Sequence, residues 1–310
     1  MPKGFVTQTA CVLLKELITL QQLEQALGSF QVQGRRHGAE SWAIGGPAVT
    51  LAFRPEVNGY VAVDLVDQVW PDHMGDPKKD PITFGAWSMG FFGPFAFPGG
   101  LEMASQQCWA WQAGNSVASH HKGFIRIRSS YVYGAGEDAP VMPKDYAAIP
   151  ELEFVTNVAL TLLGLPEALC YFNPNGEVLR DRNGLRESLE FARSADLLPL
   201  DIWSNIRLFN IDSDWLLMDT VGNRQLDLPD IEACFCRGYA CRDVDRFLRN
   251  VTWYLHQKGE IIEDGDTMDG PGGIRWQAKS YENGLAAPPR RVLGWLPMDE
   301  AEVPEKLRKR

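Results

Sequence analysis

Hydrophobic and polar positions in the first half of the chain predict strands and helices in a mixed order. Residues 5–14 form an apolar, β-rich run, and Thr19 is placed to cap a helix that ends near Gly28. Apolar runs at 48–53 and 60–66 are joined by a turn-forming connection, which is typical of a hairpin. Further elements expected in this half are helices at 103–111 and 116–121 and a strand at 124–133.

The second half continues the alternation of helices and strands. A helix with an apolar face covers 151–163, and a strand at 168–172 runs into the turn-forming sequence Asn-Pro-Asn-Gly at 173–176. Both halves together predict an α+β fold with mixed or antiparallel sheets and packed helices in two subdomains. The elements expected beyond residue 176 are helices at 185–193 and 243–257, a hairpin of strands at 205–211 and 215–220, and strands at 231–236 and 273–278.

The best candidate for a boundary between the two subdomains is the segment 134–150. It contains three prolines and two glycines together with Glu137 and Asp138, a composition typical of an irregular crossing between folded units. We therefore expect an N-terminal α+β subdomain over 1–140, which includes a segment rich in Gly and Phe, and a C-terminal α+β domain over 141–310.

The net charge of the chain indicates which kinds of partner it can bind. The formal net charge is −10, and residues 151–304 hold 15 Lys and Arg against 26 Asp and Glu, whereas residues 1–150 hold 11 against 13. An acidic surface repels nucleic acids and anionic membranes and attracts a basic protein. We therefore expect a protein partner with a basic surface, and neither nucleic acid nor membrane as a partner.

One segment without charged residues, 81–101, is long enough on paper to span a bilayer. Its three prolines and five glycines break the continuous helix that a span needs, so no membrane span is expected. The first residues lack the apolar core of a secretory signal, and the six scattered cysteines are expected to be reduced and buried. These features predict a cytoplasmic location.

The densest cluster of carboxylates lies between residues 260 and 270. Oxygen ligands around a glycine can hold Ca²⁺ or Mg²⁺, but the EF-hand spacing fails because Met268 occupies a ligand position and no glutamate follows at the required distance. We interpret this segment as a solvated acidic loop that can meet a basic partner. Its acidic residues are Glu260, Glu263, Asp264, Asp266 and Asp269.

A second acidic group, Asp212, Asp214 and Asp219, flanks the expected hairpin. Three neighbouring carboxylates can bind metal ions for phosphoryl chemistry, yet Asp-Ser-Asp is also an ordinary turn sequence and no histidine stands beside it. The histidines at 120–121 and the cysteines near residue 236 lack the spacing of a zinc site. Because no nucleophile elbow, P-loop or dinucleotide fingerprint is present, we expect no metal, no cofactor and no enzymatic activity.

Aromatic side chains crowd the stretch between residues 84 and 97, which glycines and prolines interrupt. Regular secondary structure cannot easily bury every ring of such a segment, so two interpretations stay open: a loop that covers the core, or an aromatic recognition surface. The residues that would make contacts in the second interpretation are Trp87, Phe91, Phe92 and Phe95.

The most distinctive sequence of the chain lies at 203–232. It contains Trp-Ser-Asn-Ile-Arg-Leu-Phe-Asn-Ile from Trp203, Leu-Met-Asp-Thr-Val-Gly from Leu217, and Leu-Asp-Leu-Pro-Asp-Ile-Glu up to Glu232. This arrangement resembles the bacterial family named domain of unknown function 4261, with the resemblance strongest over 145–298. The family offers no accepted catalytic motif, and some of its long members look like accessory or immunity proteins of type VI secretion that stand beside nuclease toxins. The runs at 70–77 and 92–100 are also similar to those long members.

These observations lead to one main functional hypothesis. The chain is expected to be a non-enzymatic immunity protein that binds a basic nuclease toxin of a type VI secretion system and neutralises it inside the producing cell. Buried aromatic rings would supply affinity, and acidic loops would speed association. The alternatives are a secretion adaptor or chaperone for an effector, and a metal-dependent hydrolase that uses the aspartate-rich turns. The expected partner contacts are Trp87, Phe91, Phe92, Phe95, Asp212, Asp214, Glu260, Glu263, Asp264 and Asp266.

Overall fold

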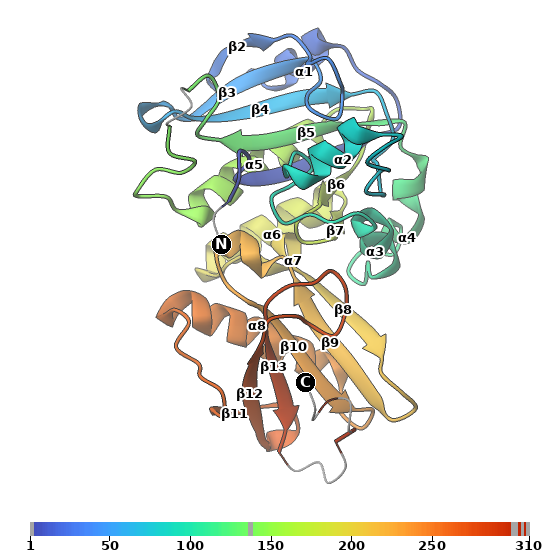
Figure 1. Ribbon diagram of the computed structural model, residues 1–310, viewed down its shortest axis with the longest axis vertical. Helices are drawn as coiled ribbons and strands as arrows, with labels where there is room; N and C mark the ends of the chain where they lie inside the picture. The colour runs from blue at the N-terminus through green and yellow to red at the C-terminus, as the bar shows by residue number, and fades with distance from the viewer. Residues whose placement is uncertain (1–2, 136–138, 299–302, 305–306, 308–310) are drawn as a thin grey trace. The chain divides into compact units, whose positions relative to one another are not determined.

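The computed structural model describes residues 3–135, 139–298, 303–304 and 307, and it divides into two compact units, Met1–Trp203 and Ser204–Arg310 (Figure 1). Each unit combines one sheet with helices, which confirms the predicted α+β fold. The units meet in sequence at Trp203 and not at the expected residue 140, because two strands beyond residue 141 complete the first sheet. Residues 136–138 of the expected boundary lie outside the described residues.

The first unit is built on an antiparallel sheet in the order β2-β3-β4-β5-β1-β6-β7. β1 lies between β5 and β6, and all of its residues are buried, which fits its nearly continuous apolar sequence. The strands are β1 (Gln8–Leu14), β2 (Val32–Arg36), β3 (Ala48–Arg54), β4 (Gly59–Val66), β5 (Gly123–Ser130), β6 (Ala168–Asn173) and β7 (Val178–Arg180).

Helices cover both faces of this first sheet. Figure 1 shows α2, α3 and α4 on one face and α5 on the other, where α5 contacts β1 and β5. The helices and 3-10 turns of this unit are α1 (Leu20–Ala26), η1 (Pro55–Val57), α2 (Pro81–Ser88), α3 (Gly100–Gln106), α4 (Gly114–Val117), η2 (Ala118–His120), α5 (Ala148–Leu162), α6 (Arg182–Ala195) and α7 (Leu200–Trp203).

Local capping explains where two of these helices begin. The Thr19 hydroxyl accepts the Gln22 N–H at 3.2 Å, so α1 starts where the sequence predicts. Asp80 accepts the Thr83 N–H at 3.3 Å, and Pro81 takes the first helical position, where its missing N–H costs nothing. Part of the segment expected to be irregular is therefore helical.

Across the described ranges, no helix is long and apolar enough to cross a membrane.

The second unit is built on a mixed sheet in the order β11-β12-β13-β10-β9-β8. β10 and β13 run parallel, and the other neighbouring pairs are antiparallel. A parallel pair needs a long connection, which here contains α8 and the β11–β12 hairpin. The elements are β8 (Asn205–Asn210), β9 (Trp215–Val221), η3 (Asn223–Leu226), β10 (Asp230–Cys236), α8 (Cys241–Lys258), β11 (Thr267–Asp269), η4 (Pro271–Gly273), β12 (Arg275–Tyr281) and β13 (Val292–Pro297).

The helix α8 covers one face of the second sheet with an apolar stripe. The Phe247 ring centroid lies 5.4 Å from that of Trp276 and 5.3 Å from that of Trp295. We call the opposite face of this sheet the outer face. Side chains alternate along a strand, so the neighbours of Trp276 and Trp295 in the sequence point toward the outer face. Its buried apolar cluster consists of Trp215, Leu217, Cys234 and Leu307.

Candidate functional site

Two arginines and two aspartates form a buried ion-pair network on the outer face. Arg207 holds Asp219 with two hydrogen bonds, from Nη2 to Oδ2 at 2.6 Å and from Nε to Oδ1 at 3.0 Å. Arg290 donates from Nη2 to the same Asp219 oxygen at 2.6 Å and from Nε to Asp230 Oδ2 at 3.1 Å. All four residues are buried, so the loss of one partner would leave an uncompensated charge away from water.

The network also fastens the loop 282–291 over the outer face. Arg207 Nη1 donates to the Ala287 carbonyl oxygen at 2.8 Å. A neighbouring carboxylate adds a second tie, because the Leu285 N–H donates to Glu232 Oε2 at 3.0 Å. These residues of the distinctive 203–232 sequence therefore serve as a structural clamp between strands and loop.

The structure separates Asp219 from the two aspartates with which the sequence groups it. Asp219 lies toward the end of β9, and both of its carboxylate oxygens accept bonds from arginines. Burial raises the pKa of the neighbouring Asp230, and the charge of Arg290 opposes that shift. The expected three-aspartate group at the hairpin is therefore not assembled.

Asp212 and Asp214 form the exposed turn between β8 and β9. Asp212 Oδ1 accepts the N–H groups of Asp214 at 3.0 Å and Trp215 at 2.9 Å, which is an Asx turn. Arg237 supports the turn from the end of β10, with Nε donating to the Ser213 carbonyl oxygen at 2.7 Å. The turn interpretation of the Asp-Ser-Asp sequence is confirmed.

The acidic loop, residues 259–266, is held along β12 by backbone and carboxylate bonds. The Gly265 N–H donates to the Ala278 carbonyl oxygen at 2.9 Å. Asp264 Oδ1 accepts the Ser280 N–H at 2.7 Å. Within the loop, Asp266 Oδ2 accepts the Glu263 N–H at 2.9 Å. The loop therefore has a fixed conformation although its carboxylates are exposed.

An apolar side chain stands among these carboxylates. Ile261 is 54% exposed and follows Glu260, whose carboxylate pairs with Arg291 Nη1 at 2.8 Å. Glu263 is exposed two residues further on. Sequence reasoning did not single out Ile261, although an isoleucine pair inside an acidic run is the signal that could have found it. The loop thus presents an exposed apolar side chain close in sequence to several exposed carboxylates.

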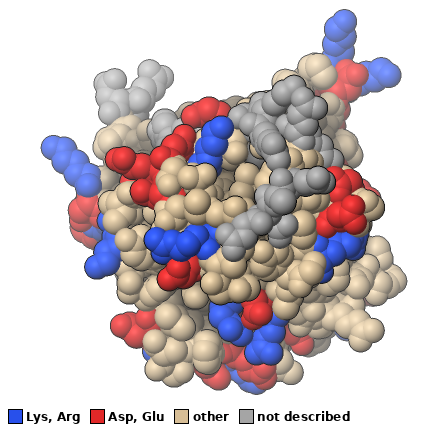
Figure 2. Space-filling view, turned by 90° about the horizontal axis from the view of Figure 1, so that it is seen from below, with Lys and Arg blue, Asp and Glu red and all other residues tan. Residues whose placement is uncertain are grey.

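The acidic loop and the Asp212–Asp214 turn lie at different corners of the second sheet. The loop borders β12 near Ser280, at the end of the sheet where β10 begins with Asp230, whereas the turn borders the end where β10 finishes at Cys236. They also flank opposite edges, beside β11–β12 and β8–β9. Figure 2 shows acidic side chains in small groups beside Lys and Arg on the face it presents. The expected acidic contacts therefore form two separate sites.

The comparison with protein families supports the resemblance seen in the sequence. Residues 219–296 match the family model Domain of unknown function (DUF4261). This DUF4261 segment is shorter than the 145–298 range in which the sequence suggested similarity, and it contains Asp219, Asp230 and Arg290 of the ion-pair network. It also contains the acidic loop. No curated protein and no solved structure matches the chain.

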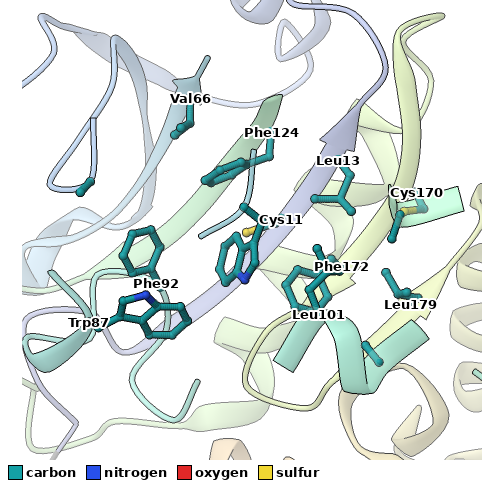
Figure 3. Close-up of a cluster of buried hydrophobic side chains, with 14 of the residues drawn as sticks. Cys11, Leu13, Val66, Trp87, Phe92, Leu101, Phe124, Cys170, Phe172 and Leu179 are labelled. Atoms are coloured by element: carbon teal, nitrogen blue, oxygen red, sulfur yellow. The ribbon is translucent and has the colours of Figure 1, made fainter. Parts of the chain in front are cut away.

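Outside the DUF4261 segment, the aromatic stretch is largely part of the core. Trp87 is 6% exposed and Phe92 is fully buried, and both pack in the cluster drawn in Figure 3. Their ring centroids lie 5.9 and 5.4 Å from that of Trp70, which also contacts Phe124 and Phe172. The expectation that Trp87 and Phe92 contact a partner is corrected, because their rings fill the interior between α2 and the first sheet.

Phe91 and Phe95 are half-buried and partly engaged within the first unit. The Phe91 ring lies beneath the guanidinium of Arg128, 5.6 Å from its centre. The Phe95 N–H donates to Asn175 Oδ1 at 3.0 Å, which ties the stretch to the β6–β7 turn. The core-covering interpretation is therefore the better one for this stretch.

A buried aspartate anchors a second clamp in the first unit. Asp64 accepts from Arg126 Nη2 at 2.7 Å and from Arg128 Nη2 at 3.0 Å. Burial alone would raise the pKa of Asp64, but the two guanidinium charges outweigh it and hold the pKa below its usual value. The arginines also donate to the Ala43 and Ile44 carbonyl oxygens, so this clamp too secures a loop.

Glu151 is a buried carboxyl group whose partners are hydroxyl groups. Thr7 Oγ1 and Tyr146 OH donate to it at 2.7 and 2.6 Å, and Ser129 also donates to it. Burial raises the pKa of Glu151, against the opposing effects of these hydrogen bonds and of Lys3. The cluster lies under the α5 N-terminus and joins β1, β5 and the segment that precedes α5.

One histidine, His121, has a structural role that the described contacts show. His121 accepts the Trp70 N–H on Nε2 at 2.7 Å, and burial lowers its pKa. No disulfide joins the described cysteines, and no group of three or more His, Cys, Asp or Glu among the described residues is placed to hold a metal ion.

A mostly apolar hollow of about 350 Å³ is lined by Trp42, Leu17 and Asp67, among other residues.

Proposed function

We propose that this protein is a non-enzymatic immunity protein that binds a basic nuclease toxin of a type VI secretion system and neutralises it. The observation that carries the proposal is the acidic loop of the DUF4261 segment, which presents exposed carboxylates around Ile261 in a fixed conformation. The sequence resemblance to long family members that stand beside nuclease toxins supports the same function.

The fixed conformation of the loop favours binding. Ordering a flexible loop on association costs conformational entropy, and this loop already has its bonds to Ala278 and Ser280 of β12. The carboxylates of the loop are therefore already in position before the partner binds. Such preorganisation increases affinity without any additional contact.

Charge and apolar area have different effects at this loop. The Glu263, Asp264 and Asp266 carboxylates are exposed and would steer a basic partner toward the loop, which raises the association rate. The exposed Ile261 side chain supplies apolar area for the centre of the contact. A cationic nuclease has the complementary charge, because its own surface binds a polyanion.

The experiment is co-expression of the tagged protein with a basic nuclease toxin of a type VI secretion system, followed by purification and a DNase assay. The proposal predicts a stable complex in which DNase activity is lost. A complex with full DNase activity would instead favour a secretion adaptor or chaperone. Absence of a complex at micromolar concentrations of both proteins would refute binding to this partner.

A further inference from the structure

The hollow of about 350 Å³ lies at one end of the first sheet. At this end β1 finishes with Leu14, β4 finishes with Val66, and β5 begins with Gly123, which pairs with Leu14. The volume is in the lower part of the range of small-molecule sites, so the hollow has room for one small ligand. Its apolar lining includes Leu17, Ile18, Leu20, Trp42 and Leu65.

One wall of the hollow is formed by the segment 38–47, which the buried ion cluster of the first unit holds in place. Arg126 Nη2 donates to the Trp42 carbonyl oxygen at 3.0 Å, and the Gly46 N–H donates to Asp64 Oδ2 at 2.9 Å. Gly46 lies so close to β4 that an added Cβ would stand 1.7 Å from a carbonyl oxygen of that strand. The wall is therefore formed before a ligand binds, which avoids the cost of ordering it on binding.

The hollow carries negative charge at one position. Asp67, which follows β4, is the one charged residue among the described lining residues, and it is exposed. Within the described ranges, no hydrogen bond or ion pair engages its carboxylate. Lys122, which precedes β5 at the same end of the sheet, is paired with Glu16 at 3.2 Å. The Asp67 carboxylate is therefore open to a cation that comes from a ligand.

We propose that this hollow binds a small amphipathic amine, with the apolar body of the ligand inside and its ammonium group beside Asp67. Burial of the apolar body against the lining supplies affinity, and the exposed carboxylate selects the positive charge. Because Asp67 is exposed, the ammonium group can keep part of its hydration and loses little free energy by desolvation. The site lies outside the DUF4261 segment and does not depend on the proposed function.

Isothermal titration calorimetry of the full chain with phenethylamine tests the proposal. Two further probes share its phenyl ring: 2-phenylethanol, which is neutral, and 3-phenylpropionate, which is an anion. We expect phenethylamine to bind with a dissociation constant of about 1 mM or lower, and at least about threefold more tightly than 2-phenylethanol. The anion should bind more weakly than either. Equal affinity for the three probes, or no binding of phenethylamine at millimolar concentrations, would overturn the proposal.

Two substitutions of exposed acidic residues test the role of charge. Asp67→Asn keeps the shape of the side chain and should weaken phenethylamine binding about three- to tenfold, without changing the affinity for 2-phenylethanol. Glu40→Gln is the matched control, since Glu40 is exposed in the same wall segment but is not among the lining residues. It should leave the affinity for both probes unchanged. Equal losses in the two variants would indicate attraction by the net charge alone and would overturn the site.

A third substitution tests the place of binding. Ala39 is exposed and lines the hollow, so the larger side chain of Ala39→Trp should occupy part of the volume. We expect this variant to bind both phenethylamine and 2-phenylethanol at least about threefold more weakly. Unchanged affinity in a folded Ala39→Trp chain would place the ligand elsewhere and overturn the proposal. If this variant does not fold, the comparison of Asp67→Asn with Glu40→Gln still decides.

Discussion

Arg290 lies between Asp219 and Asp230, 2.6 Å from an oxygen of the first and 3.1 Å from an oxygen of the second. The next residue, Arg291, pairs with Glu260 at 2.8 Å, but its side chain is half exposed. Two successive arginines of the DUF4261 segment thus make ion pairs in opposite environments. The buried pairs join the loop 282–291 to β9 and β10, and the exposed pair joins this loop to the acidic loop at the surface.

This difference predicts unequal costs for the same substitution. Arg290→Gln removes the guanidinium that bonds to Asp230 and leaves Asp219 with Arg207 alone, so it should lower the free energy of unfolding by about 3–5 kcal/mol. Arg291→Gln is the matched control and should cost less than about 1 kcal/mol, because water screens the pair with Glu260. Urea unfolding followed by circular dichroism measures both. Equal small losses would contradict a clamping role for Arg290.

The buried carboxyl group of Glu151 predicts a pH dependence of stability. Because burial raises its pKa, the folded protein holds the proton more tightly than the unfolded chain does. The stabilisation from this group is full below the unfolded pKa and is lost as the pH rises through the folded pKa. Glu151→Gln stays neutral, so its free energy of unfolding should improve relative to the wild type as the pH rises above 4.5, the ordinary pKa of a glutamate. Parallel pH profiles in urea unfolding would contradict this assignment.

Local sequence patterns were sufficient to predict several elements of the fold. The hairpin of β8 and β9 is nearly where alternation and the Asp-Ser-Asp turn place it. The helix α2 was not expected, because its prolines and glycines resemble those of a loop, although Asp80 and Pro81 form a good helix start. The strand β13 was also missed, because it follows a proline-rich stretch and its pairing with β10 is parallel and long-range.

The candidate site could be predicted only where exposure follows from local composition. The acidic loop is exposed as expected, since consecutive carboxylates are rarely buried without partners. The burial of Phe92 depends on contacts with Trp70 and distant strands, which a sequence pattern does not encode. The Asp219–Arg290 pair spans 71 positions and has no local signal.

Phe92 and Phe95 are buried to different extents, so truncating each to alanine should change the free energy of unfolding by different amounts. Phe92→Ala removes a fully buried ring and should lower the free energy of unfolding by about 3–5 kcal/mol. Phe95→Ala, at a half-buried position, should cost clearly less. Thermal and urea unfolding compare the two variants. If Phe95→Ala were as costly as Phe92→Ala, the assignment of Phe92 to the core and Phe95 to its margin would be wrong.

Association with a basic partner should depend on the charge of the acidic loop. Glu263→Lys reverses an exposed charge without removing the Asp264 and Asp266 bonds that hold the loop, and it should slow association severalfold at low salt. Glu187→Lys on α6 changes the net charge equally and should have a much smaller effect. Stopped-flow kinetics at 20 and 200 mM salt would separate them. Identical rates for the two variants would exclude this loop from the contact.

Titration of the nuclease's DNase activity with this protein tests the central claim most directly. The proposed function predicts that activity falls linearly and reaches zero at a fixed stoichiometric ratio, as tight occlusion requires. Activity that stays constant while the complex forms would contradict neutralisation.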